Sequence, residues 1–204
     1  MIYVVLAALG IFIVHFCDPA AMKRIPLVKP AVWVIGAGLF AYATTMIWLW
    51  PGKLSLPAWS SWLGWALLFV SVALLGISFV INLPFRETYV ATGVGGRLIT
   101  TGFYALVRHP GVLWAIPLAA GFVLVSESRL ALTAAPILLM LDVAAVIMQD
   151  LLFFRRMFSG YDKYSRTTPM LIPNRKSIGA FISSVRPQGL TPGLEGGDKD
   201  VRLG

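Results

Sequence analysis

The sequence has few charged residues and only one cysteine. Charged side chains make up 13% of the 204 residues, against about 25% in ordinary globular domains, and hydrophobic residues make up 58%. This composition excludes a soluble globular domain. Cys17 alone cannot form an intrachain disulfide, and zinc-ligand spacings such as C-x-x-C do not occur. The first apolar run lacks a basic flank and a cleavage site, so we interpret it as a retained span.

Long apolar stretches separate the few charges. A hydrocarbon core about 30 Å thick is crossed by about 20 apolar helical residues. The stretches therefore predict an all-α integral membrane protein with about five transmembrane helices, the last two forming a C-terminal helical hairpin. Asp18 and Pro19 are expected to end the first helix. The expected spans cover about residues 2–16, 31–50, 59–83, 110–125 and 130–154.

Lysine and arginine alternate between heavily and lightly charged connections. Successive connections carry three, one, three and one of them, and the segment directly after the last span opens with four more. Positive loops stay in the cytoplasm, which predicts an outer N-terminus and a cytoplasmic C-terminus, in the inner or plasma membrane of a prokaryote. The formal net charge of +8 is thus assigned to loops and anionic headgroups rather than to nucleic acid. The residues counted are Lys23, Arg24, Lys29, Lys53, Arg86, Arg97, Arg108, Arg129, Arg155, Arg156, Lys163 and Arg166.

The chain is expected to form one membrane domain over residues 1–176. Its polar segments at 85–109 and 155–173 are predicted to meet on the cytoplasmic side. Residues 177–204 are poor in apolar side chains and rich in glycine, proline and charge, which predicts a disordered tail.

Polar side chains mark the ends and one face of the last two expected spans. Arg108 and His109 precede the fourth span, and ionisable groups near membrane depth usually face a protein cavity. Asp142 and Gln149 are seven residues apart and share a helix face, whereas Asp150 is turned about 100° away. We expect this face to meet other helices and Asp142 to pair with a polar group from another span. Phe153 and Arg156 are expected to continue the face.

The same region carries a family resemblance. Gly102-Phe103-Tyr104 followed by Arg108-His109-Pro110 resembles the G-x-Y-x-x-x-R-H-P signature of the isoprenylcysteine carboxyl methyltransferase and phospholipid methyltransferase superfamily. Gln149-Asp150 stands where that family has an acidic pair, and Tyr161 and Tyr164 match its Y-x-x-Y. A closing segment at 167–173 is also similar, so the match covers about residues 98–173.

The resemblance implies an S-adenosylmethionine-dependent methyltransferase that acts on a lipophilic acceptor, such as an isoprenylcysteine, a phospholipid or a small thiol. The donor would bind from the cytoplasm and the acceptor would arrive from the bilayer. Arg108 and Asp150 would be the catalytic residues, and no metal is implied. An arginine suits the carboxylate of the donor, because its planar fork binds carboxylates bidentately. The cofactor-binding residues carried over are Tyr104, Arg108, His109, Gln149, Asp150, Tyr161 and Tyr164.

Two departures from the family pattern keep other interpretations open. Gln149 replaces an acidic residue, and Val112 stands where an aromatic residue is common. Membrane sterol and steroid reductases, which use NADPH, and a haem-dependent isomerase are also similar, and a non-catalytic membrane protein of the same fold is a further alternative. Simpler roles compete as well. Arg108 would then be a snorkelling loop residue and His15 a structural one, and Tyr161 and Tyr164 would anchor the membrane interface.

Overall fold

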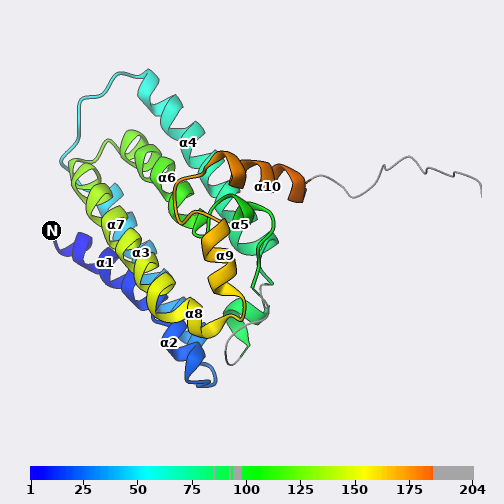
Figure 1. Cartoon of the computed structure of the whole chain (residues 1–204). Helices are drawn as coiled ribbons and strands as arrows, with labels where there is room; N and C mark the ends of the chain where they lie inside the picture. The colour runs from blue at the N-terminus through cyan, green and yellow to red at the C-terminus, as the bar shows by residue number, and fades with distance from the viewer. Residues whose placement is uncertain (85, 92, 94–97, 186–204) are drawn as a thin grey trace, which may run out of the picture.

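The computed structural model describes residues 1–84, 86–91, 93 and 98–185, without the side chains of residues 87 and 89. These residues form helices and loops, and no β-strand occurs among them (Figure 1). Arg97 and most of the expected tail lie outside the described residues. In chain order the helices are α1 (Ile2–His15), α2 (Cys17–Met22), α3 (Val28–Trp48), α4 (Trp59–Gly76), η1 (Ile77–Ile81), η2 (Arg86–Val90), α5 (Phe103–Leu106), α6 (Pro110–Ser126), α7 (Arg129–Met148), η3 (Gln149–Phe154), α8 (Arg155–Met157), α9 (Tyr161–Thr167) and α10 (Arg175–Val185), where η marks π-helical turns.

Four helical stretches of the described chain are long and apolar enough to cross a membrane. They cover Ile2–Met22, Val28–Trp48, Trp59–Ile81 and Arg129–Met157, whereas Pro110–Ser126 is apolar but shorter. Large apolar side chains also cover the outer faces of these helices, and Trp62 is 80% exposed. A helix that is apolar on its outer as well as its inner face is typical of a membrane span. The expectation of an all-helical membrane protein is therefore supported.

Helix α1 ends at His15, close to the expected end of the first span, but helical structure resumes almost at once. We expected Asp18 and Pro19 to break it, and this is wrong, because α2 follows α1 after Phe16 alone. Pro19 is the third residue of α2, and proline is tolerated in a first helical turn because its missing N–H would have no partner there. Asp18 is thereby carried on a helix instead of in a loop.

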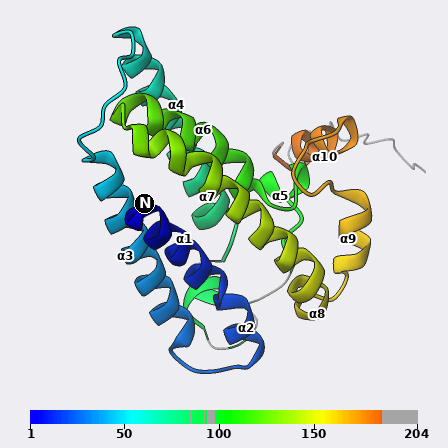
Figure 2. The same ribbon diagram turned by 90° about the vertical axis from the view of Figure 1, so that its left-hand side faces the viewer.

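Two helix pairs make the close contacts of the fold. Figure 2 shows α1 beside α3 and α4 beside α6, and both pairs cross at glycines. A Cβ on Gly10 of α1 would lie 2.9 Å from the Gly36 carbonyl oxygen of α3. A Cβ on Gly121 of α6 would lie 2.8 Å from the Gly64 carbonyl oxygen of α4. Small residues let membrane helices approach until their backbones touch, so these glycines set the spacing within each pair.

Replacement of Gly36 tests this packing. We expect Gly36→Val to destabilise the fold by about 3 kcal/mol, because its Cβ would meet backbone that cannot move aside. Gly38→Val is the matched control, since it makes the same change on the same helix where a Cβ meets nothing within 4 Å. Denaturation in detergent, followed by tryptophan fluorescence, measures both variants. Equal stability of the two would contradict the role given to Gly36.

Helix α7 joins the two pairs. It contacts α1, α3 and α6, and its start is fixed by Ser128, whose hydroxyl accepts from Ala131 N (3.2 Å) and donates to the Ile47 carbonyl at the end of α3 (2.7 Å). The buried apolar core lies next to this junction. Its small residues are consistent with close helix packing. The core consists of Val4, Ala7, Ala43, Ile47, Val123, Leu130, Ala131 and Ala134.

The chain beyond α7 folds back over the N-terminal end of α6 (Figure 1). Part of the segment expected to be disordered is helical, because residues 177–185 belong to α10. Phe181 of α10 stacks on Phe103 of α5 with ring centroids 5.4 Å apart, and Gly102 N donates to Ser184 Oγ (3.1 Å). These tertiary contacts stabilise α10, although the amino-acid composition of this segment did not predict a helix.

Candidate functional site

The two expected polar segments meet in the structure. Arg108 N donates to the Pro169 carbonyl (2.9 Å) and His109 N donates to the Met170 carbonyl (3.2 Å), so the R-H-P segment is tied to the segment after α9. Gly102 starts the short helix α5 with φ 61° and ψ −139°, a conformation that favours glycine. Pro110 then opens α6 at its first position, where proline is well tolerated. The local sequence thus brings Arg108 and His109 to the entry of α6.

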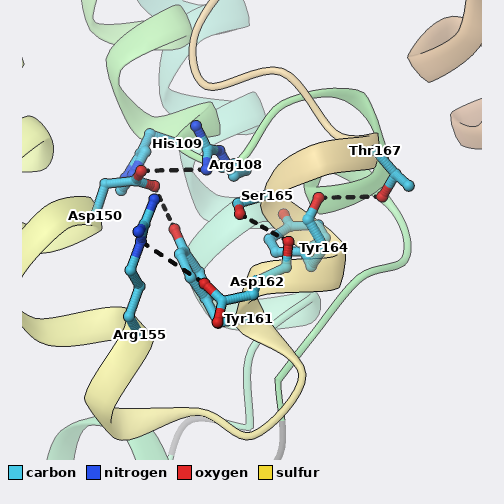
Figure 3. A network of polar contacts seen from close by, with 9 residues as sticks. All are labelled: Arg108, His109, Asp150, Arg155, Tyr161, Asp162, Tyr164, Ser165 and Thr167. Carbon is cyan, nitrogen blue, oxygen red and sulfur yellow. Dashed lines mark hydrogen bonds and ion pairs between the residues drawn. The ribbon is translucent and has the colours of Figure 1, made fainter.

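Asp150 is the centre of a buried polar network (Figure 3). Arg108 Nη1 lies 3.1 Å from one carboxylate oxygen, and His109 Nε2 lies 3.4 Å from the other. The Tyr161 hydroxyl donates to that second oxygen. Asp150 is only 4% exposed and His109 7%. A buried charge has to be paired and hydrogen-bonded, and here Asp150 orients three side chains from two segments, the entry to α6 and helix α9.

The two tyrosines of the Y-x-x-Y are buried, with 2% of Tyr161 and 7% of Tyr164 exposed. The interpretation of them as interface anchors is therefore wrong. The Tyr164 hydroxyl donates to the Tyr104 carbonyl (2.7 Å), which ties α9 to α5. Burial, and for Tyr161 the bond to Asp150, raise both tyrosine pKa values well above the ordinary value. Both hydroxyls consequently remain protonated donors at neutral pH.

Most of the predicted site residues line a cavity. A cavity of about 740 Å³ lies between the two helix pairs, within the range of about 300–1,000 Å³ usual for small-molecule sites. Asp150 is not among the described residues that line it, so it acts on the cavity through the groups it holds. The predicted site residues that do line it are Tyr104, Arg108, His109, Gln149, Tyr161 and Tyr164.

Arg108 is not a snorkelling residue, and one of its hydrogen-bond donors is unpaired. Its side chain is 12% exposed and is paired with Asp150. Within the described part of the chain, its buried Nε has no hydrogen-bond partner. Buried donors are normally satisfied, so an unpaired one at a cavity wall requires an explanation such as a bound acceptor group.

The polar face of the last span follows a different register from the one expected. Asp142 and Gln149 both line the cavity as predicted, but the next residue to do so is Phe154 rather than Phe153. Arg156 is exposed. The reason is η3, since a π-helical segment has more residues per turn and shifts the face that follows it. Phe154 stacks on His109 with ring centroids 5.7 Å apart and so becomes part of the site.

Further polar residues reach the cavity from α1, α2 and α3, far from the family motif. His15 Nε2 lies 3.8 Å from Asp142 Oδ1, which supplies the partner expected for Asp142 from another span. Gln149 Nε2 donates to Asp18 Oδ2 (2.5 Å). Lys29 is buried, and its Nζ donates to the Ala91 and Gly93 carbonyls. In the sequence, His15 and Asp18 are isolated polar residues near the end of an apolar run. This pattern did not indicate which residues they would contact.

No protein family, curated protein or solved structure matches the chain. Any function proposed for the chain therefore rests on the arrangement of the described residues alone.

Proposed function

We propose that the protein is an integral membrane methyltransferase that transfers a methyl group from S-adenosylmethionine to a lipophilic acceptor. The observation that carries this proposal is a buried arginine, with one donor unpaired, at the wall of a large and mostly apolar cavity. A polar ligand with a carboxylate would suit the arginine, and an apolar ligand would suit the rest of the cavity.

The residues present fit the methyl donor. Asp150 engages Nη1 of Arg108, and the buried Nε has no partner among the described residues, so this donor would be left for a carboxylate once a small movement of the side chain exposes it. The Asp150 pair also fixes the orientation of the guanidinium plane, which reduces the entropy lost on binding. His109, Tyr104 and Tyr164 surround the same end of the cavity. Gln149 is bonded to Asp18, and its remaining amide oxygen is a possible acceptor for a ligand N–H or O–H.

The chain's contribution to the reaction would be binding, orientation and the exclusion of water. Bound S-adenosylmethionine supplies a methyl group on a positively charged sulfur. Arg108 would hold the amino-acid end of this donor, with Asp150 and Tyr161 keeping Arg108 in place. Alignment of two reactants is worth several kcal/mol of a reaction barrier, and an apolar cavity removes competing water.

The acceptor half of the cavity would take an apolar chain. Phe40 and Ile47 of α3, Leu68 and Leu75 of α4, and Leu118 of α6 line it, so both helix pairs contribute. An acceptor anchored in the bilayer would place its tail among these side chains and its reactive end near Arg108. This arrangement favours a membrane lipid or a lipid-linked group over a water-soluble acceptor.

The proposed membrane arrangement has five spans. The four long helical stretches would cross the bilayer and α6 would form the fifth span, paired with α7 in a hairpin through the turn at Glu127 and Ser128. The alternation of lysine and arginine supports an outer N-terminus and a cytoplasmic C-terminus. The membrane of this proposal is the inner or plasma membrane of a prokaryote.

Parallel ligand titrations test the proposal. Detergent-purified protein would be titrated with S-adenosylmethionine, with its demethylated product S-adenosylhomocysteine and with NADPH, followed by calorimetry. We expect saturable binding of the first two and none of NADPH. Binding of NADPH alone would replace the proposal with a membrane reductase. Binding of no ligand would favour a non-catalytic protein of the same fold.

A further inference from the structure

We propose that His15 and Asp142 form the proton-accepting pair of this cavity, and that the acceptor is methylated at a group that carries a proton, namely a thiol, a hydroxyl or an ammonium group. The inference rests on the proposed methyl transfer and narrows its substrate class. The R-H-P network has another task, because Nε2 of His109 and Nη1 of Arg108 both lie against the Asp150 carboxylate.

The surroundings of His15 fix which ring nitrogen carries the proton. His15 is the last residue of α1, and its Nδ1 lies 2.9 Å from the Ile11 carbonyl oxygen. A carbonyl oxygen only accepts hydrogen bonds, so Nδ1 must be the donor. In the neutral ring Nε2 then has a free lone pair. An imidazole held in this tautomer presents an Nε2 lone pair that can accept a proton from a ligand.

Nε2 of His15 faces both the cavity and Asp142. The 3.8 Å between Nε2 and Asp142 Oδ1 is too long for a hydrogen bond but short enough for an ion pair. His15 and Asp142 both line the cavity, and their side chains are 20% and 24% exposed. Nε2 is thus open to a ligand. The nearby carboxylate would stabilise the positively charged ring that forms when Nε2 takes a proton.

Other ionisable groups along this part of the cavity have separate partners. Asp18 of α2 accepts from Gln149, Lys29 of α3 donates to two backbone carbonyls, and the Cys17 Sγ lies 3.7 Å from the Lys29 carbonyl. His109 of α6 is bonded to Asp150. Among the described residues, Asp142 is the carboxylate that lies within ion-pair distance of His15.

The distance to the donor end is suitable for a shared substrate. Asp142 and Gln149 lie on one helix, seven residues and about 10 Å apart, and Gln149 adjoins the Asp150 network. One cavity reaches from Arg108 to His15, so a single acceptor group can lie between them. In the proposed step the acceptor's X–H bond breaks and its proton goes to His15 Nε2. The electron pair left on X forms the new bond to the methyl carbon, and the electrons of the broken S–CH₃ bond remain on the sulfur of the product thioether.

The tautomer of His15 is the first test and requires no turnover. The chain has two histidines, so ¹⁵N-histidine NMR of detergent-solubilised protein gives two pairs of ring signals, and His15→Gln assigns them. We expect the neutral ring of His15 to carry its proton on Nδ1. A proton on Nε2 in the neutral ring, or a ring that stays charged through neutral pH, would overturn the inference.

Two probe acceptors provide the second test. Dodecanethiol loses a proton when it is methylated, whereas dodecyl methyl sulfide has no proton to lose. We expect His15→Gln to slow methylation of the thiol by about 10²-fold or more and to remove its dependence on pH, while the sulfide reacts at the wild-type rate. Asp142→Asn should weaken the thiol reaction in the same selective way. The sulfide reaction also shows that each variant is folded.

The outcomes separate the two hypotheses. Equal loss on both probes, or wild-type protein that binds the donor but does not methylate the thiol, would overturn the inference and leave the proposed function standing. Wild-type protein that does not bind S-adenosylmethionine would overturn both.

Discussion

Replacement of Asp150 by asparagine is expected to destabilise the protein by about 3–5 kcal/mol. The change leaves the charge of Arg108 buried without its partner and weakens the bonds to His109 and Tyr161. A buried ion pair broken on one side costs far more than the net contribution of the intact pair. Chemical denaturation in detergent micelles, followed by the fluorescence of the seven tryptophans, measures the loss.

Asp162→Asn is the matched control for this prediction. Asp162 also pairs with an arginine, Arg155, at 3.8 Å, but 73% of the Asp162 side chain is exposed. Exposed pairs contribute little, so this variant should unfold like the wild type. The double variant Asp150→Asn with Arg108→Met removes the unpaired charge and should recover part of the stability. Similar behaviour of Asp150→Asn and Asp162→Asn would show that the network is not the buried pair described here.

Substitution of Arg108 is expected to have the largest effect on ligand binding. Arg108→Lys keeps a positive charge beside Asp150 but loses the planar fork and the unpaired Nε–H. A hydrogen bond to a charged group contributes about 1.5–3 kcal/mol, so we expect S-adenosylmethionine to bind about 10- to 150-fold more weakly. Arg108→Ala should abolish measurable binding and also lower stability. Calorimetric titration with the donor and with S-adenosylhomocysteine gives both affinities.

Arg155→Lys is the control for the binding experiment. Arg155 lies near the network in Figure 3, yet it is half exposed and is not among the described residues that line the cavity. Its conservative replacement should leave donor affinity unchanged. Wild-type affinity in Arg108→Lys, together with retained stability, would remove Arg108 from the donor site and with it the main support for a methyltransferase.

Several features of the site were predictable because they are local. Arg108, His109 and Pro110 are consecutive, and a proline at the start of an apolar run predicts a helix entry whatever the rest of the chain does. Asp142 and Gln149 share a face because seven residues are nearly two helical turns. The burial of Tyr161 and Tyr164 was not predictable in this way. Aromatic residues beside a span fit the membrane interface equally well, and only the bonds from Tyr161 to Asp150 and from Tyr164 to the Tyr104 carbonyl show that both are buried inside the fold.

The π-helical segment η3 shows where periodicity stops being informative. Sequence spacing assumes a constant number of residues per turn, and η3 changes that number between Gln149 and Phe154. Phe154 rather than Phe153 therefore stacks on His109. The additional residue per turn depends on how this helix packs against its neighbours, and the helix propensities of its residues do not predict it.

The sequence by itself determined that the described chain is helical with stretches long and apolar enough to cross a membrane, because hydropathy over about 20 residues is a local property and the bilayer sets the length. It also identified the polar groups near the spans. Only the tertiary structure decided which of them meet. Gln149 bonds to Asp18, 131 residues away, and Asp142 faces His15. Helix packing determines such partners. The glycine contacts that set this packing form between two helices, so the sequence of one helix alone does not specify them.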